Sequence, residues 1–410
     1  MKYCDVLIIG AGPSGAIAGA NLVQKGFTVQ IIEKLTFPRF VIGESLLPQC
    51  NAILAKNNLL ETIEKENYML KAGAIFENEE GEKETYHFRN NLGEPYNTSF
   101  QVKRESFDNA LLEGAKALGV KVKHEEEVIS YLQEKNQIIS QDKQGNKTHY
   151  QAKFVLDASG YGRVLPRLLD LEIPSTFKIR NAFFTRVSND IRPQGEEAGY
   201  ISIFIHDQNK AWIWVIPFSD GTTSVGIVCE ESYFHASTLS EEAFFDKILS
   251  TNTQAKKRFK DAKKLQSVQR ILGYSSNVKT MHGKGFALAG NATEFLDPVF
   301  SSGVTLALVS GDLAGDLIAK ELQGETIDWQ RDYEEKMLQG IDVFRNFILA
   351  WYDGRLQKMF FATTKQEKII QSINSILSGY VWNNKNIFVK DTENKINFIL
   401  ERINSMLKEK

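Results

Sequence analysis

Residues 5–15 read DVLIIGAGPSG, a short apolar run that leads directly into the pattern Gly10-x-Gly12-x-x-Gly15. The run is typical of a buried parallel strand, and the next segment, AIAGANLVQKG, has a helical pattern that ends at Gly26. A second apolar run, FTVQIIE, follows and ends at Glu33. Strand, glycine turn, helix, strand and acid in this order predict a dinucleotide-binding βαβ unit.

Each glycine of this unit has its own physical role. Gly10 permits the tight turn, Gly12 lets the backbone approach a pyrophosphate, and Gly15 lets helix and strand pack closely. The N-terminus of the helix offers unpaired N–H groups and a positive dipole end to the phosphates. We expect Glu33 to accept hydrogen bonds from ribose hydroxyls.

Length and composition limit the classes of protein to consider. A chain of 410 residues predicts two or three domains, and 42% apolar with 24% charged residues is typical of a soluble globular protein. A net charge of −2 gives no reason to expect nucleic acid or an anionic membrane as partner. The three cysteines and six histidines show no disulfide framework and no ligand spacing, so we expect a cytoplasmic protein without a metal site. No stretch approaches the ~20 unbroken apolar residues of a membrane span, so we expect none.

Three later segments add to the evidence for nucleotide binding. The first, from residue 101, is a strand followed by an amphipathic helix, QVKRESFDNALLEGAKALGVKV. The second is a buried strand that runs into Asp157 and Gly160, FVLDASGYGR. The third is a strand, a turn with Asp297-Pro298, a Ser-Ser-Gly turn and a long helix, GFALAGNATEFLDPVFSSGVTLALVSGDLAGDLIAKEL.

With these segments the chain resembles the p-hydroxybenzoate-hydroxylase-like FAD proteins over most of residues 1–335. In that family a Gly-Asp pair contacts the ribityl chain, and the turn after Asp-Pro presents backbone N–H groups to the flavin. Here the pair is Gly290-Asn291, and asparagine can still form a hydrogen bond but carries no charge. The resemblance implies contacts between FAD and the following residues: Gly10, Gly12, Pro13, Ser14, Gly15, Glu33, Lys34, Arg39, Ser45, Arg104, Val128, Asp157, Gly160, Asn291, Asp297, Pro298, Gly303 and Val304.

Within that superfamily, three features are similar to the flavin-dependent halogenases that act on phenols and pyrroles. They are FPRFVIGESLLP at residues 37–48, Lys71 within NYMLKAGAIFE, and Trp212-x-Trp214-x-Ile216-Pro217. The resemblance implies that the two tryptophans lie beside the flavin and that Lys71 faces the substrate chamber and positions hypohalous acid. It also implies a chloride or bromide site at Ser302 and Gly303.

The same resemblance implies the partners. The chain has no second GxGxxG pattern, which fits an enzyme that receives FAD already reduced by a flavin reductase. The implied substrate is an electron-rich aromatic compound, a phenol or pyrrole, free or carried by an acyl or peptidyl carrier protein.

The residue pattern alone supports a plainer interpretation of two of these features. Alternation in MLKAGAIFE places Leu70 and Ala72 on one face and Lys71 on the other, which predicts a solvent-exposed lysine. If Lys71 is functional instead, burial should lower its pKa. Trp212 and Trp214 lie on one face of a strand, where aromatic side chains usually belong to a core.

Other functions remain open at this point. A reductase or dehydrogenase of the geranylgeranyl-reductase type shares the FAD motifs, and an aromatic hydroxylase uses the same fold. Arg104 is either an FAD contact or an exposed arginine at a helix N-terminus. Asn291, in place of aspartate, is the one feature that favours a flavin-binding protein without catalysis.

We therefore predict an α/β protein with a discontinuous Rossmann-like FAD-binding domain, an inserted, mainly antiparallel β-sheet substrate domain and a helical C-terminal region. Alternating patterns on either side of Ser219-Asp220-Gly221 predict a β-hairpin in the inserted domain. The predicted ranges are 1–66, 101–165 and 272–335 for the FAD-binding domain, 67–100 and 166–271 for the substrate domain, and 336–410 for the C-terminal region.

Overall fold

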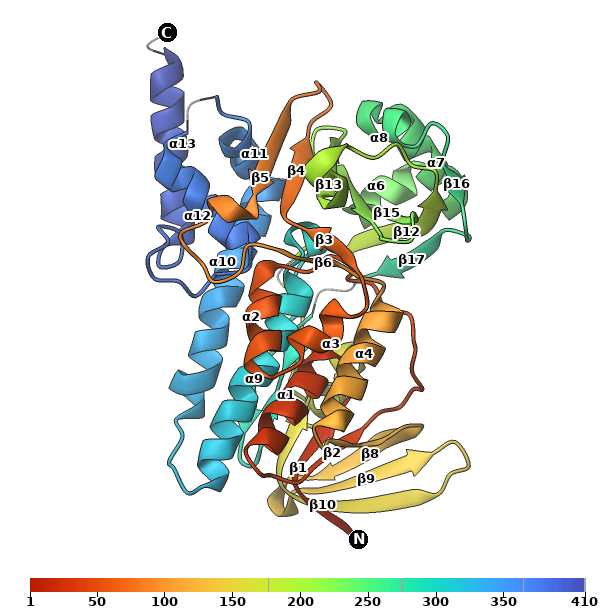
Figure 1. Ribbon diagram of the computed structural model, residues 1–410, viewed down its shortest axis with the longest axis vertical. Coiled ribbons are helices and arrows are strands. Elements are labelled where there is room, and N and C mark those ends of the chain that lie inside the picture. The colour runs from red at the N-terminus through yellow and green to blue at the C-terminus, as the bar shows by residue number, and fades with distance from the viewer. Residues whose placement is uncertain (176, 274–275, 364, 409–410) are drawn as a thin grey trace.

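A computed structural model describes residues 1–175, 177–273, 276–363 and 365–408 (Figure 1). It contains two large sheets, with helices against the first sheet and at the C-terminal end of the chain. This mixed α/β arrangement agrees with the fold class predicted above, whereas the domain boundaries given there stay a prediction.

The first sheet is built around the N-terminal strand. Its parallel strands lie in the order β20-β10-β1-β2-β7, and β19, β9 and β8 add antiparallel pairings. Val6 pairs with Phe154 on one side and with Val29 on the other, and all three side chains are buried. A strand covered on both faces needs such an unbroken apolar run. The bounds are β1 (Lys2–Ile9), β2 (Val29–Ile32), β7 (Lys121–Lys123), β8 (Glu126–Leu132), β9 (Gln137–Asp142), β10 (Lys147–Asp157), β19 (His282–Gly283) and β20 (Phe286–Leu288).

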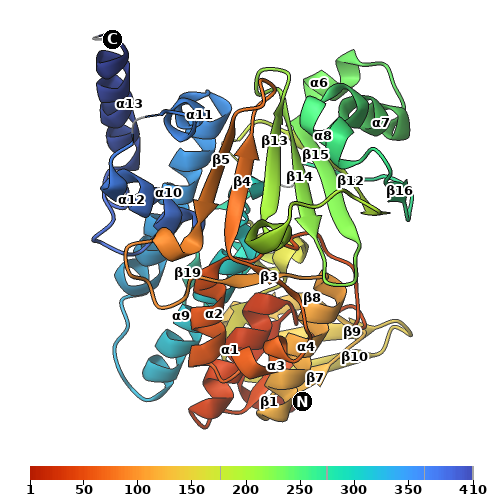
Figure 2. The same cartoon turned by 45° about the horizontal axis from the view of Figure 1, so that its top comes forward.

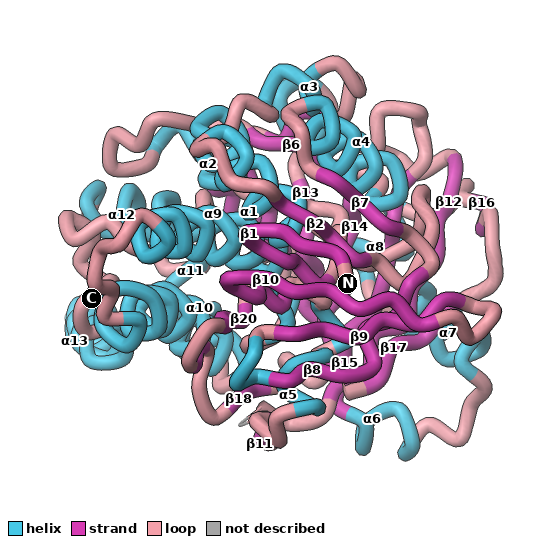
Figure 3. The backbone as a smooth tube through the Cα atoms, turned by 90° about the horizontal axis from the view of Figure 1, so that it is seen from below, coloured by secondary structure: helices cyan, strands magenta, loops and turns pink. Residues whose placement is uncertain are grey.

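Helices cover this sheet, and Figure 3 shows α1 and α9 next to its strands. α9 is long and apolar enough to cross a membrane by length and composition, but 72% of its apolar window is buried, as in the core helix of a soluble protein. Asp312 and Asp316 of α9 accept hydrogen bonds from Asn21 of α1, which ties the two helices together. The helix bounds are α1 (Pro13–Gln24), α2 (Pro48–Lys56), α3 (Leu60–Glu64), α4 (Arg104–Ala117), α5 (Val164–Leu168) and α9 (Ser302–Leu322).

The second sheet has the order β16-β12-β15-β14-β13-β4-β5, with β17 also paired to β12. Its pairings are antiparallel except for that between β13 and β4. The hairpin predicted around residues 219–221 is confirmed, because β14 and β15 pair across this turn. The bounds are β4 (Gly73–Glu77), β5 (Lys83–His87), β12 (Arg180–Ser188), β13 (Ile201–His206), β14 (Ala211–Pro217), β15 (Thr223–Glu230), β16 (Lys263–Lys264) and β17 (Gln269–Leu272). Three helices pack against one face of this sheet: α6 (Glu231–Ala236), α7 (Glu241–Thr251) and α8 (Thr253–Arg258).

The four remaining strands form two short antiparallel ribbons. One pairs β11 (Glu172–Ile173) with β18 (Asn277–Val278), and the other pairs β3 (Met69–Lys71) with β6 (Ser99–Gln101). Figure 2 shows β3 between the helices of the first sheet and the start of β4. The β3–β6 ribbon therefore lies where the chain passes from one sheet to the other.

The C-terminal region is helical, as the sequence predicts. Figures 1 and 2 show its helices beside β5, at the edge of the second sheet. The ring of Phe360 packs between Phe76 and Tyr86, so this region shares one hydrophobic core with the sheet. The bounds are α10 (Glu335–Tyr352), α11 (Arg355–Phe360), α12 (Glu367–Leu377) and α13 (Thr392–Lys408).

Candidate active site

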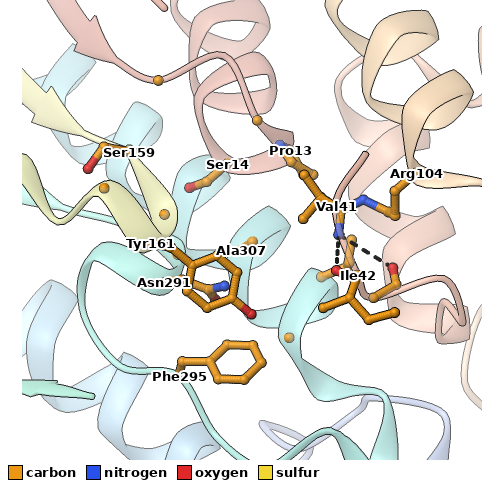
Figure 4. A pocket seen from close by; sticks show the side chains of 18 of the residues that line it. Pro13, Ser14, Val41, Ile42, Arg104, Ser159, Tyr161, Asn291, Phe295 and Ala307 are labelled. Carbon is orange, nitrogen blue, oxygen red and sulfur yellow. Dashed lines mark hydrogen bonds between the residues drawn. The ribbon is translucent and has the colours of Figure 1, made fainter. Parts of the chain in front are cut away.

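A cavity of about 570 Å³ lies between the two sheets, at the carboxyl ends of β1 and β2. Ligands of open α/β sheets bind at this end of the strands. Figure 4 shows the wall from close by, with Arg104 on one side and Tyr161, Asn291 and Phe295 on the other. The predicted residues that line it are Gly10, Gly12, Pro13, Ser14, Glu33, Lys34, Arg39, Ser45, Arg104, Val128, Gly160, Trp212, Trp214, Asn291, Pro298, Gly303 and Val304.

The three glycines of the N-terminal motif occupy different surroundings. Gly10 has a φ of +97°, and a Cβ there would lie 2.6 Å from the carbonyl oxygen of Ala158. A Cβ on Gly15 would lie 2.0 Å from the carbonyl oxygen of Gly10. At Gly12 the nearest atom is the end of the Arg39 side chain, at 3.5 Å, so the backbone there is open to the cavity. These positions match the turn, packing and phosphate-approach roles.

Glu33 is held by the backbone of the same unit. Its carboxylate accepts hydrogen bonds from the N–H of Ala11 at 2.8 Å and from the N–H of Leu35 at 2.9 Å. These bonds fix a buried carboxylate at the cavity wall, where an acceptor for ribose hydroxyls is expected.

Arg104 supports the loop that covers one side of the cavity. It begins α4, is buried, and pairs in a bidentate manner with Asp108 at 2.7 and 3.0 Å. It also donates to the carbonyl oxygens of Ile42 and Gly43, the dashed lines in Figure 4. The interpretation of Arg104 as an exposed helix-terminal arginine is therefore wrong.

Four of the residues predicted to contact FAD or the halide do not line the cavity. Asp157 is fully buried and accepts from the N–H groups of Ser159 at 2.8 Å and Leu165 at 2.6 Å, so its side chain shapes the turn instead of facing the cavity. Burial raises the pKa of Asp157. The other three lie just behind the wall: Gly15, Asp297 and Ser302.

The residues that are present fit FAD. Ser14 Oγ, Ser45 Oγ and Arg39 Nε are buried and have no hydrogen-bond partner within the described chain. A buried polar atom without a partner is costly, and a bound polar ligand would supply the missing partners. The cavity volume lies within the range of ligand sites, and the backbone at Gly12 leaves room for a pyrophosphate.

The two tryptophans of β14 form part of the wall on the side of the second sheet. Their ring centroids are 6.1 Å apart, and both are almost fully buried. The indole N–H of Trp212 donates to Tyr352 Oη at 2.8 Å, and that of Trp214 donates to Ser224 Oγ at 3.1 Å. Trp214 lies opposite Gly226, where a Cβ would be 2.2 Å from the indole. The two side chains are thus fixed core groups that also face the cavity.

The sequence alone did not identify several of these partner residues. Gly226 and Ser224 follow from the hairpin once its register is known, since the turn fixes Gly226 opposite Trp214 and Ser224 opposite Ile216. Glu44 also lines the cavity, pairs with Arg186 at 3.0 Å, and has its pKa raised by burial. No sequence signal indicates Tyr352, which comes from α10.

Lys71 is buried, which the alternation pattern did not predict. Its side chain is 1% exposed while Leu70 is 52% exposed, so the predicted assignment of faces is wrong. The reason is the place of β3, which pairs with β6 and presents Lys71 to the main-chain carbonyl of Leu46. Lys71 Nζ donates to that oxygen at 2.9 Å and lies 5.4 Å from the ring centroid of Phe88. Burial lowers the pKa of Lys71 from 10.5 to about 7, and the residue does not line the FAD-sized cavity.

The start of α9 provides an anion-attracting end beside the cavity. Ser301 has a φ of 58° and precedes the helix without a side-chain cap. The N–H groups of the first turn are therefore available as hydrogen-bond donors, and the helix dipole favours a negative charge there. Gly303 and Val304 line the cavity, and the buried Ser302 Oγ has no partner among the described residues.

Comparisons with known proteins agree with this geometry. The FAD binding domain family matches residues 3–338. The 1H-pyrrole-2-carbonyl-(peptidyl-carrier protein) chlorinase of Pseudomonas fluorescens is 30% identical over 419 residues, which cover 96% of this chain and 92% of that protein.

Solved structures are also similar over the whole chain. A flavoprotein/dehydrogenase from Cytophaga hutchinsonii is 40% identical, with a TM-score of 0.95 and full coverage of both chains. The myxobacterial chondrochloren halogenase CndH is 27% identical, with a TM-score of 0.77 over 99% of this chain and 90% of that one. The chain belongs to the FAD binding domain family and, within it, to the flavin-dependent halogenases.

Proposed function

We propose that this halogenase is the halogenating component of a two-component system that takes reduced FAD from a separate flavin reductase. Its substrate in this proposal is an electron-rich aromatic ring, a phenol or a pyrrole, free or carried by a carrier protein. The observation that carries the proposal is a buried lysine of lowered pKa outside an FAD-sized cavity whose wall includes two fixed indoles. Bound reduced FAD supplies the activation of oxygen by which a halide becomes an electrophilic halogen species.

The start of α9 is the proposed halide site. An anion there meets the free N–H groups of the first helical turn at Gly303 and Val304, and the unpartnered hydroxyl of Ser302 can turn towards it. This places the halide against the same wall as the flavin.

Trp212 and Trp214 are proposed to separate the aromatic substrate from the flavin. Both indoles have their N–H groups bonded to protein acceptors, so neither ring is free to swing out of the wall. In this proposal a small electrophile passes the partition towards Lys71, whereas the aromatic ring of the substrate is too large to reach the flavin.

Lys71 is proposed to bind and orient the electrophile. One of its hydrogens is held by Leu46, and the remaining N–H donors can bond the oxygen of hypohalous acid. With a pKa of about 7, the side chain exists near neutral pH as both ammonium and amine. Positioning of the electrophile in a water-poor setting is a large contribution to the rate of such reactions.

The proposal of a carrier-bound substrate rests on similarity. The Pseudomonas fluorescens relative is a carrier-protein pyrrole chlorinase by its name. Comparison of pyrrole-2-carboxylate with the same acid as a carrier-protein thioester tests this point, and preference for the free acid contradicts it.

The test of the function is halide dependence. The protein is mixed with reduced FAD, oxygen, bromide and a panel of phenols and pyrroles, and brominated products are measured. Lys71→Ala should lower product formation about a hundredfold or more and leave flavin reoxidation within about twofold. Lys153→Ala, at an exposed lysine, is the matched control and should change neither rate.

The results also separate the competing functions. A loss of reoxidation together with bromination in Lys71→Ala would make Lys71 a structural residue. Halide-free reduction of a lipid by the wild-type protein would favour the reductase, which the description of the Cytophaga hutchinsonii relative as a dehydrogenase also favours. NAD(P)H consumption by the purified protein alone, stimulated by a phenol, would favour the hydroxylase.

A further inference from the structure

The last residue of α10, Tyr352, connects two parts of the active site. Its hydroxyl lies 2.8 Å from Trp212 Nε1 and 2.8 Å from Asp297 Oδ2. The three residues are far apart in the chain and come from β14, α10 and the turn before α9.

The chemistry of the three groups fixes the direction of both hydrogen bonds. An indole N–H can only donate and a carboxylate can only accept, so Tyr352 Oη accepts from Trp212 and donates to Asp297. Burial, first of all, raises the pKa of Tyr352 well above its ordinary value, so the hydroxyl keeps the proton that it donates. The guanidinium of Arg180, from β12, lies 3.5 Å from the centroid of the Tyr352 ring and holds that ring in place.

The two ends of this connection have separate tasks in the site. Trp212 is part of the wall of the FAD-sized cavity. Asp297 also accepts from the N–H of Val299 at 3.2 Å, which shapes the turn η6 (Pro298–Phe300) that leads to the start of α9. Tyr352 does not line the cavity, so it acts through these two residues.

We infer that Tyr352 is a positioning residue, which fixes the indole of Trp212 relative to the turn that holds the halide and so keeps the partition closed during halogenation. This inference rests on the proposed function. It also gives the C-terminal region a part in the flavin side of the site.

The test uses Tyr352→Phe, which removes only the hydroxyl. Indole N–H signals are recorded by NMR in full-length, FAD-free protein labelled with ¹⁵N at tryptophan, and Trp212→Phe assigns the signal of Trp212. The Trp212 signal should move upfield in Tyr352→Phe because its acceptor is lost, while the Trp214 signal should stay. With reduced FAD and bromide, brominated product per FAD oxidised should fall about five- to tenfold and hydrogen peroxide release should rise, since a lost buried hydrogen bond has this order of effect.

Tyr131→Phe is the matched control. Tyr131 is also buried, and its hydroxyl donates to Asn136 at 2.8 Å in the hairpin of β8 and β9, outside the cavity wall. This variant should show comparable loss of thermal stability and wild-type product per FAD. An equal fall in product for both variants would overturn the inference, because the effect would then be general destabilisation.

Two other results would overturn it as well. They are an unchanged Trp212 signal in Tyr352→Phe, and a shifted signal with unchanged product and peroxide. If Tyr352→Phe does not fold, hydrogen exchange of the wild-type indole groups decides: a Trp212 N–H that exchanges as fast as an exposed indole contradicts the bond. Failure of the proposed function is distinct, because the wild-type protein would then form no brominated product whatever the NMR signals show.

Discussion

The glycine-rich unit and the proposed electrophile site at Lys71 are built in opposite ways. In the first, Gly15 and Glu33 contact residues within the first 35 positions, and Gly10 packs against Ala158 in the turn after β10. In the second, Lys71 bonds Leu46, and Trp212 bonds a residue of α10. The comparison shows that a local pattern specifies the glycine turn, whereas packing between segments decides the surroundings of Lys71 and Trp212.

The largest expected effect is a contrast between two glycines of the cofactor side, Gly15 and Gly12. Gly15→Ala places a Cβ 2.0 Å from a backbone oxygen that cannot move aside, so we expect little soluble protein or a loss of stability above about 4 kcal/mol. Gly12 has a φ of −69°, and its added Cβ would meet only the flexible end of Arg39 at 3.5 Å. Gly12→Ala should therefore fold with a melting temperature near that of the wild type but bind FAD at least about tenfold more weakly.

Thermal unfolding and FAD titration by flavin fluorescence measure both variants. Wild-type FAD affinity in a folded Gly12→Ala protein would show that the pyrophosphate does not lie at this turn. A stable, FAD-binding Gly15→Ala protein would show that close packing of helix and strand is not required there.

The substrate side is tested by the pH dependence of stability. The pKa of Lys71 is lowered from 10.5 to about 7 in the folded protein, so between these values the unfolded chain binds more protons. The free energy of unfolding should therefore rise with pH through this window. Below pH 7 the folded protein bears the full cost of a buried charge, on the order of 3–6 kcal/mol for a shift of this size.

Lys71→Met removes that cost. The variant should be more stable than the wild type below pH 7, and the difference should shrink as the pH approaches 10.5. Urea unfolding at pH 6 and pH 9.5 measures it, with Lys153→Met, at an exposed lysine, as control. A difference between Lys71→Met and wild type that does not depend on pH would mean that Lys71 keeps its ordinary pKa.

The same division explains how much could be predicted from the sequence. The βαβ unit and the β14–β15 hairpin follow from periodicity and turn residues, which act over a few positions. The exposure of Leu70 and the burial of Lys71 could not be predicted from the sequence. In a three-residue strand between two sheets, the neighbouring segments decide which face is buried. The role of Asp157 in the turn and the bond from Trp212 to Tyr352 likewise depend on packing between distant segments.

Asn291 is the position on the cofactor side where the local pattern departs from its family, and it gives the smallest expected effect. Its side chain is half-buried and lines the cavity near Tyr161 and Phe295 (Figure 4). Asn291→Asp introduces an acceptor-only, charged group, and charge-assisted hydrogen bonds to ribityl hydroxyls are stronger than neutral ones, so FAD should bind about three- to tenfold more tightly. Flavin fluorescence titration measures the gain, and Asn291→Ala should shift affinity in the opposite direction. Equal affinities for all three proteins would mean that this side chain does not contact the cofactor, and the cofactor side would then also depend on contacts that its sequence pattern does not reveal.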